Sequence, residues 1–290
     1  MKVRIIANPV SGGGRGKTVA QTLQDLLCEA LGSAELILTQ KPGDAEEEAG
    51  RSGADCIVAV GGDGTVNEIA NGMRDTAATL AILPMGTANV VARELGIPRD
   101  PQVVAAMIVE HHIREMDVGV TNERRFLLGA GAGIDAAVAQ AVSERRGRSS
   151  SYLKWVGPML STAFTYSYPE IRAVVDGKEV SATAQYAIVG NCRYSAGVFV
   201  ATPKAKIDDG LLDVCLMHNL NPLRLARLAL QLRHARFLER DDVVYVQGKH
   251  VELRPASDDP VPLQIDGDPA GCIPAEFTVA PKALQVVVPR

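Results

Sequence analysis

The sequence predicts a two-domain fold: an α/β domain with a doubly wound, mostly parallel sheet in residues 1–118, and a mostly antiparallel β-sandwich in residues 119–290. Three observations lead to this prediction. Apolar runs that suit buried parallel strands alternate with helical patterns in the first part. Short alternating runs separated by turn residues dominate the second part. Glycine-rich turns follow two of the apolar runs, at the strand ends where α/β sheets bind ligands.

The elements of the first domain follow from hydrophobic periodicity. Runs of apolar residues indicate buried strands, and apolar residues spaced three and four apart indicate helices. The expected strands are residues 3–7, 35–39, 56–60 and 80–83, and the expected helices are residues 17–31, 44–51, 65–73 and 103–110.

The second domain is expected to contain mainly short strands. Asp176-Gly177 lies between two alternating runs, as in a two-residue hairpin turn. The expected strands are residues 126–129, 171–176, 184–189, 211–216, 243–246, 250–254 and 284–288, with helices at 136–146 and 223–239.

Composition excludes several classes of protein. Lys and Arg total 30 and Asp and Glu total 34, which argues against a general nucleic-acid binder. The five cysteines form no CxxC pair, so neither a zinc site nor a disulfide framework is expected. The amino terminus lacks the apolar segment of a signal peptide, and no apolar stretch reaches the ~20 residues that span a bilayer. We therefore expect a cytoplasmic protein.

The strongest motif follows the apolar run at residues 56–60. Glycines let the backbone approach a phosphate, and the amides of the next helix face the anion. An acid in such a loop would repel phosphate unless a divalent cation lies between them. The alternative is a plain strand–turn–helix in which Asp63 caps its own helix. The candidate nucleotide-binding residues here are Gly61, Gly62, Asp63, Gly64, Thr65, Val66, Asn67 and Glu68.

Two further glycine-containing turns extend the pattern. Residues 84–89 read Pro-Met-Gly-Thr-Ala-Asn, and Asn89 is placed to start the next helix. Residues 8–18 nearly form a P-loop, but that motif needs a glycine where Ser11 stands.

The three turns together resemble the diacylglycerol-kinase catalytic family, which includes bacterial soluble lipid kinases and sphingosine and ceramide kinases. The Gly-Gly-Asp-Gly-Thr segment is also similar to NAD kinases and phosphofructokinases, so the narrower resemblance depends on residues 65–68 and 84–89. Residues 117–119, 133–135 and 206–212 match as well, and the resemblance covers nearly the whole chain.

This resemblance implies an ATP site formed by Asn8, Ser11, Thr39, residues 61–67 and Thr87. It implies a magnesium site in the second domain, with Asp209 as the carboxylate and the backbone carbonyls of Lys206 and Leu211 beside it. Without the resemblance, Asp209-Gly210 would also suit a hairpin turn. The family's proton acceptor lies in an Asp-Gly-Glu triplet, and the matching residues here are Asp266-Gly267-Asp268.

Two residues depart from the family pattern. Asp268 is one methylene shorter than the usual Glu, and a misplacement of ~1 Å can be costly in rate. Val90 stands where the family often has Asp, so one acid of the metal–water network is absent.

The expected function is a lipid kinase that transfers the γ-phosphate of ATP to diacylglycerol and yields phosphatidic acid. Asp63 and Mg²⁺ would hold the phosphates, and Asp268 would accept the proton of the lipid hydroxyl. The alternatives are another acceptor, such as phosphatidylglycerol, a sphingoid base or NAD, and a weakly catalytic lipid-binding regulator, which Val90 and Asp268 keep open.

A lipid substrate requires transient, peripheral contact with a membrane surface. Residues 144–155 combine basic side chains with the single tryptophan, and residues 223–240 combine leucines with arginines. The alternative for the second segment is an ordinary amphipathic helix. The sequence leaves the oligomeric state open, a homodimer included.

Overall fold

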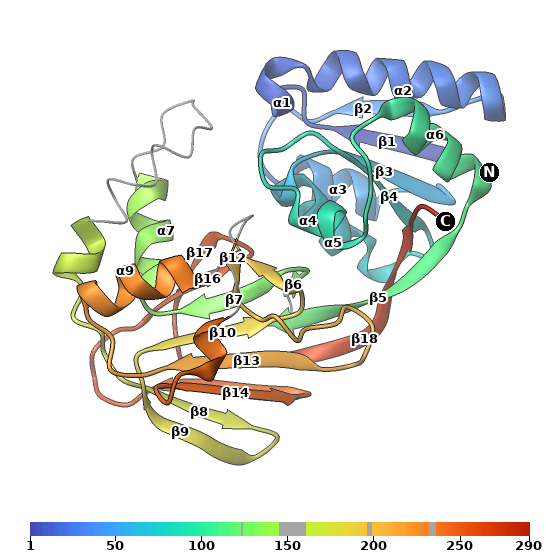
Figure 1. Ribbon diagram of the computed structural model, residues 1–290. Coiled ribbons are helices and arrows are strands. Elements are labelled where there is room, and N and C mark those ends of the chain that lie inside the picture. Colours follow the sequence, from blue (N-terminus) through green and yellow to red (C-terminus); the bar gives the residue numbers. More distant parts are fainter. Residues whose placement is uncertain (123, 145–160, 196–198, 232–235) are drawn as a thin grey trace. The chain divides into compact units, whose positions relative to one another are not determined.

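The computed structural model describes residues 1–122, 124–144, 161–195, 199–231 and 236–290. The chain forms two compact units (Figure 1): Met1–Asp117 together with Lys282–Arg290, and Val118–Pro281. The sequence analysis assigned everything after residue 118 to the second domain. The structure differs at the carboxyl terminus, which returns to the first unit.

The first unit contains a parallel sheet with strand order β2-β1-β3-β4. Its third and fourth strands in this order, β3 and β4, are buried at every position, which explains why they lack polar alternation. The α/β fold class predicted from the sequence is confirmed. The strands are β1 (Val3–Ala7), β2 (Glu35–Leu38), β3 (Cys56–Gly61) and β4 (Thr79–Pro84).

Helices cover both faces of this sheet. In Figure 1, α2 (Gly16–Leu31) and α6 (Pro101–Glu110) lie on one face, and α3 (Asp44–Gly50) and α4 (Asp63–Gly72) lie on the other. Three shorter helices follow loops: α1 (Ser11–Gly14), η1 (Met73–Asp75) and α5 (Val90–Glu94).

Local sequence sets the ends of these helices. The Asp100 carboxylate accepts the Gln102 N–H at the start of α6, and Pro101 occupies the first helical position, where a missing N–H costs nothing. Gly32 ends α2 in the left-handed conformation at a φ of 87°.

Two strands carry the chain from one unit to the other: β5 (Ile113–Thr121) and β18 (Ala275–Val287). The buried carboxylate of Asp117 accepts the Lys282 N–H, with 2.7 Å between Oδ1 and N. Val286, near the end of β18, pairs in parallel with Leu80 of β4. The expected strand at residues 284–288 therefore exists, but it belongs to the first unit.

The second unit is a sandwich of two antiparallel layers, as the sequence predicted. One layer is a six-stranded sheet with the order β14-β13-β10-β7-β16-β17. Its strands are β7 (Gly129–Ala132), β10 (Tyr186–Gly190), β13 (Leu212–Met217), β14 (Val243–Gly248), β16 (Pro262–Ile265) and β17 (Asp268–Cys272).

The other layer contains the end of β5, the first part of β18 and four further strands. Apolar side chains from both layers form one core, in which Phe126 and Phe277 meet edge to face. A short pair, β11 (Tyr194–Ser195) and β12 (Phe199–Val200), lies apart. The four strands are β6 (Arg124–Phe126), β8 (Ile171–Val175), β9 (Lys178–Ala184) and β15 (His250–Pro255).

Two expectations for the second unit need correction. The expected strand at 126–129 falls on the link between β6 and β7, because an acid in another hairpin binds the N–H groups of that link. The expected helix at 223–239 is α9 (Pro222–Gln231) followed by η2 (Arg236–Glu239), and residues 232–235 lie outside the described part.

A second, smaller core covers the outer face of the six-stranded sheet. It joins Ile134 from α7 (Ile134–Glu144) to Phe237 from η2 and to Tyr186, Ile188 and Cys215 from the sheet. Within the described ranges, no helix is both long and apolar enough to cross a bilayer.

Candidate active site

The loops that follow the four strands of the first unit gather at one edge of the sheet. Strand register places Ala7 beside both Leu38 and Val60. The Asn8 N–H donates to the Val60 carbonyl over 3.0 Å, and the Thr39 N–H donates to the Ala7 carbonyl over 2.9 Å. The structure therefore brings together the three loops that contain Asn8, Thr39 and the glycine-rich motif.

The two glycine turns contact each other through their backbones. A Cβ added to Gly86 would lie 2.6 Å from the Gly62 Cα, a distance that real side chains do not adopt. The Met85 N–H also donates to the Gly61 carbonyl over 2.8 Å. The second motif is weak in the sequence alone, but it packs directly on the first.

Asn89 fixes the shape of the second turn. Its Oδ1 accepts the Gly86 N–H over 2.8 Å, and its Nδ2 donates to the Gly86 carbonyl over 2.7 Å. Asn89 is 4% exposed and starts α5, as expected, in the left-handed conformation at a φ of 48°. Asn tolerates this conformation better than most residues.

The first loop is built around a chain reversal at Asn8. The Ser11 hydroxyl donates to the Asn8 carbonyl over 2.8 Å, and the Asn8 Oδ1 accepts the Val10 N–H. A Cβ at Gly16 would lie 2.1 Å from the Asn8 carbonyl oxygen, so only glycine fits where α2 begins. Asn8 and Ser11 thus shape the loop through their own polar groups.

Asp63 occupies a different position from the one expected of a simple cap. Gly62 is the N-cap of α4, and Asp63 is its first residue. The Asp63 Oδ1 accepts the Val90 N–H over 2.6 Å, so this carboxylate ties α4 to α5. Burial raises the pKa of Asp63, while backbone N–H donors, chiefly Val90 and Val91, act to lower it.

The other predicted residues of this motif divide into two groups. Val66 and Asn67 are buried, and Asn67 accepts two hydrogen bonds from the Nδ2 of Asn71. Their side chains contribute to the packing of α4. Gly64 and Thr87 are exposed, and Glu68 is half-buried.

The sequence analysis did not single out Arg99. Its Nη2 lies 3.4 Å from the carbonyl oxygens of both Gly86 and Thr87, so a cation borders the second turn. No spacing rule connects residues twelve and thirteen positions apart in a loop, and the sequence offered no signal for this contact.

The Asp-Gly-Asp triplet of the second unit forms the hairpin between β16 and β17. Asp266 and Gly267 have φ values of 49° and 91°, as in a type I′ turn. The Asp266 carboxylate is a structural anchor, since it accepts the N–H groups of Leu127, Leu128 and Gly129 over 2.8–3.0 Å.

Asp268 follows this turn as the first residue of β17. It pairs with Ile265 across the hairpin and is exposed. The triplet thus separates its two acids: Asp266 is bound to the neighbouring link, and Asp268 presents its side chain at the surface of the unit.

The predicted metal-binding loop precedes β13. The Asp209 Oδ1 accepts the Leu211 N–H over 3.2 Å, which closes a tight turn around Gly210 at a φ of 72°. Lys206 and Asp209 are exposed. One carboxylate and backbone carbonyls are all oxygen donors, the ligands that Mg²⁺ prefers, and they leave room for water. The residues present therefore fit a hard divalent cation.

This loop and the hairpin lie at the same end of the six-stranded sheet. Gly190 pairs with both Asp213 and Gly129, and Ala130 pairs with Ile265. Three strand spacings, about 14 Å in total, separate β13 from β16. In the described residues, His, Cys, Asp and Glu side chains nowhere gather in threes at metal-binding distance.

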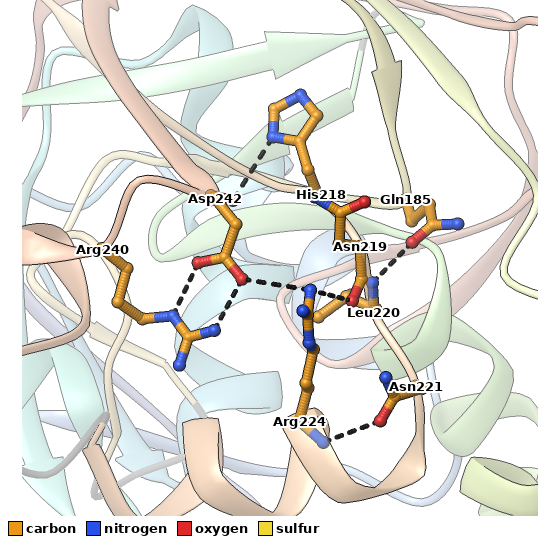
Figure 2. Close-up of polar contacts among 8 residues, drawn as sticks. All are labelled: Gln185, His218, Asn219, Leu220, Asn221, Arg224, Arg240 and Asp242. Atoms are coloured by element: carbon orange, nitrogen blue, oxygen red, sulfur yellow. Dashed lines mark hydrogen bonds and ion pairs between the residues drawn. The ribbon is translucent and has the colours of Figure 1, made fainter.

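The arginines around α9 are partly neutralised (Figure 2). Arg240 forms an ion pair with Asp242 at 2.6 Å, and Arg224 lies 3.7 Å from the same carboxylate. The Asn221 Oδ1 also accepts the Arg224 N–H at the helix start. Two of the arginines predicted to attract lipid are therefore close to a carboxylate of the same unit.

The remaining surface of α9 is more exposed. Leu223 is 82% exposed and Arg227 is exposed, while Leu225 packs against the smaller core. Of the other predicted membrane segment, residues 145–155 lie outside the described part.

A polar hollow of about 460 Å³ lies in the second unit beside this ion-pair cluster. Glu170, Asp241 and Asp242 contribute three carboxylates to its lining, and His218 lines it as well. This charge is unsuited to phosphate, so the hollow is not the nucleotide site.

Comparisons with known proteins cover the whole chain. Residues 2–121 match the diacylglycerol kinase catalytic domain, and residues 129–288 match the YegS C-terminal NAD kinase beta sandwich-like domain. Diacylglycerol kinase of Bacillus subtilis (strain 168) is 30% identical over 301 residues, which span 100% of this chain and 97% of that protein. Diacylglycerol kinase of Staphylococcus carnosus is 27% identical, with 100% and 95% covered.

Solved structures agree with the sequence relatives. A diacylglycerol kinase crystal structure from Bacillus anthracis str. Sterne has the same fold, with a TM-score of 0.78 at 24% identity. A second structure from that organism matches with a TM-score of 0.80 at 26% identity. Each comparison covers 99% of this chain and 97% of the other.

An α/β unit with paired glycine turns at its sheet edge, followed by this antiparallel sandwich, defines a two-domain, ATP-dependent phosphotransferase of the lipid-kinase type. Matches over both domains take the assignment one step further. The chain belongs to the diacylglycerol kinase catalytic-domain family.

Proposed function

We propose that this kinase transfers the γ-phosphoryl group of ATP to the free hydroxyl of diacylglycerol and yields phosphatidic acid and ADP. The observation that carries the proposal is the backbone contact between Gly62 and Gly86, which leaves two Cβ-free turns at one sheet edge. The names of the relatives, which match over the whole chain, support diacylglycerol as the acceptor.

In this proposal the first unit binds the nucleotide. Asn8, Ser11, Thr39, Thr87 and the 61–68 turn line the sheet edge, where backbone N–H groups suit an anionic ligand. Asp63 holds α5 against the glycine turns and so preserves their shape, because its carboxylate binds the Val90 N–H. The Arg99 guanidinium adds positive charge beside Thr87.

Asp268 is the proposed proton acceptor. As the lipid oxygen forms its bond to the γ-phosphorus, the bond from phosphorus to the β-phosphate oxygen breaks and ADP leaves. The proton of the lipid hydroxyl moves to the Asp268 carboxylate. A general base of this kind contributes roughly 10²–10⁴-fold to rate.

A divalent cation, for which we propose Mg²⁺, supplies charge neutralisation for the phosphates when bound. Asp209 with the carbonyls of Lys206 and Leu211 would hold a second cation. Because β13 and β16 are about 14 Å apart, that cation would hold the loop before β13 in place and would take no part in the proton transfer to Asp268.

Transient membrane contact completes the proposal. The exposed Leu223 and Arg227 on α9 suit a surface that enters the interface of an anionic bilayer. Leu223→Asp is expected to reduce sedimentation with phosphatidylglycerol-containing vesicles and to leave turnover in detergent micelles unchanged. Equal sedimentation of variant and parent would remove α9 from membrane contact.

One experiment tests the function directly. Labelled ATP, Mg²⁺ and a panel of diacylglycerol, phosphatidylglycerol, a sphingoid base, a polyprenol and NAD are incubated with the protein, and products are separated by chromatography. Labelled phosphatidic acid supports the proposal, whereas a different labelled product would identify another acceptor in place of diacylglycerol. ATP binding without any phosphorylated product favours the second candidate, a weakly catalytic regulator. The buried Val90, which stands where the family often has an acid, supports that candidate.

A further inference from the structure

Asp135 is a half-buried acid that the proposed chemistry does not use. It lies in the first turn of α7, where its Oδ1 accepts the Ala136 N–H over 2.7 Å. Burial raises its pKa to about 6, against the opposing effect of hydrogen bonds from Gln264, Ala136 and Tyr186. Removing a carboxylate from water costs free energy, so the groups that the Asp135 carboxylate binds are of particular interest.

Asp135 is linked to the hairpin that carries Asp268. The Gln264 Nε2 donates to the Asp135 Oδ2 over 2.9 Å. The Oε1 of the same amide accepts the Gly267 N–H over 2.7 Å. Gln264 is 8% exposed, so water does not readily replace either bond. Two hydrogen bonds therefore connect α7 to the residue immediately before Asp268.

The backbone around this pair is shaped to permit it. Gly131 of β7 lies opposite Gln264 in the sheet register. A Cβ at Gly131 would lie 2.0 Å from the Asp135 Oδ2 and 2.6 Å from the Gln264 Nε2. Any other residue at 131 would therefore occupy the space where the acid and the amide meet.

The orientation of the Gln264 amide between Asp135 and Gly267 depends on the Asp135 carboxylate. An amide has one donor end and one acceptor end. Because the Asp135 Oδ2 only accepts, it holds the Nε2 of Gln264 toward itself and leaves the Oε1 facing Gly267. Reversing the amide would place its donors against the Gly267 N–H.

We infer that Asp135 is a positioning residue: through Gln264 it fixes the Gly267 backbone and thereby aims the Asp268 carboxylate. This inference rests on the proposed role of Asp268 as proton acceptor. Asp266 holds the other side of the same turn through Leu127, Leu128 and Gly129, so the hairpin is clamped from two directions.

The test is a polarity swap in the full-length protein. Asp135→Asn places an amide donor against the amide donor of Gln264, and Gln264→Glu places two carboxylates together. The double variant Asp135→Asn/Gln264→Glu restores both bonds and conserves net charge, because the new carboxylate at position 264 accepts from the new amide at position 135 and from the Gly267 N–H. Unfolding curves for all four proteins establish that each is folded.

Activity is measured with dioleoylglycerol in mixed micelles. Each single variant should lose roughly tenfold or more in kcat, since small misplacements of a reacting group are costly, while KM for ATP changes less than about twofold. The double variant should recover to within roughly threefold of the parent. A double variant no faster than the singles, or singles as fast as the parent, overturns the inference.

Amide hydrogen exchange gives a readout independent of turnover. Peptides covering residues 262–268 should exchange faster in both single variants and return to the parent rate in the double variant. If the parent does not phosphorylate dioleoylglycerol, the proposed function fails on its own. The exchange pattern then still decides whether Asp135 fixes the turn, and unchanged exchange in the singles overturns that.

Discussion

Asp268 shows how one residue can be separated from a neighbour of the same type. Both acids of the triplet are near the hairpin, but Asp266 accepts three backbone N–H groups and Asp268 is exposed at the start of β17. Replacing the first should therefore disturb the fold, and replacing the second should disturb the chemistry.

Asp268→Ala is expected to lower kcat about 10²–10⁴-fold with ATP affinity unchanged, because the variant lacks only the proposed proton acceptor. The measurement is kcat with dioleoylglycerol alongside nucleotide binding by calorimetry. Asp266→Ala serves as the contrast, with a loss of stability of about 2–4 kcal/mol in chemical unfolding. Undiminished kcat in Asp268→Ala would remove this residue from the mechanism.

Asp135 also predicts a specific dependence of stability on pH. With its pKa raised to about 6, the folded protein binds this proton more tightly than the unfolded chain, whose Asp titrates near 3.9. Between about pH 4 and 6 the native state holds the extra proton, so this residue's contribution to the unfolding free energy falls as pH rises.

Asp135→Asn removes that titration. Relative to the parent, the variant should gain up to about 3 kcal/mol of unfolding free energy between pH 4 and pH 7, on top of a pH-independent loss from the broken amide contact. Urea unfolding at several pH values measures the difference. A difference that stays flat across this range would show that burial does not raise the pKa of Asp135.

Among the elements, the two glycine turns of the first unit depend on each other. Gly86→Ala would force a Cβ against the Gly62 Cα, so we expect a loss of about 1–3 kcal/mol in stability and a clear loss of ATP affinity. Gly53→Ala is the matched control, because its Cβ would meet nothing within 4 Å. Similar unfolding midpoints for the two variants would show that the turns do not pack as described.

The ion-pair cluster beside α9 gives a second prediction for the elements. The pKa of Asp242 is lowered, mainly by its hydrogen bond from Arg240, so its stabilising effect is present above the unfolded pKa and is lost as pH falls. Asp242→Asn should cost about 1–2 kcal/mol at pH 7 and less at pH 3, as measured by urea unfolding. An equal cost at both values would contradict this.

The sequence predicted the elements best where one physical signal was strong. The strand at Cys56–Gly61 and the hairpin at Asp176-Gly177 follow from continuous burial and from paired turn residues. It failed at residues 126–129, because the partner that occupies their N–H groups, Asp266, is more than 130 positions away. The Asp135–Gln264 pair was missed for the same reason, whereas the contacts of Arg99 were missed because no spacing rule connects residues twelve and thirteen positions apart in a loop.

From the sequence, the loops that form the candidate site could be predicted, but the contacts among their residues could not. The register of the parallel strands brings Asn8, Thr39 and the glycine turns to one edge, as the position of ligand sites in such sheets would suggest. Side-chain roles were harder to predict. Asp63 binds the Val90 N–H, a contact that needs the fold to be seen.

At the scale of the whole molecule, the carboxyl terminus is part of the first unit. Leu284, Val286, Val287 and Val288 are all buried there, and β18 pairs with β4. Truncation after Pro281 should therefore unfold the first unit and abolish ATP binding, although every glycine turn is retained. Truncation after Val288 is the control and should bind ATP normally. Calorimetric ATP titration compares them, and binding by the shorter chain would contradict the prediction.

The chain passes between the two units twice, near Asp117 and near Lys282, and this determines which segments can be exchanged between relatives. The second unit is, in connectivity, an insert spliced into the first unit, its host, and the host's last strand is made only after that insert has been synthesised. A chimera that exchanges residues 118–281 between relatives keeps the host intact, whereas one joined at a single junction separates the host from its own tail.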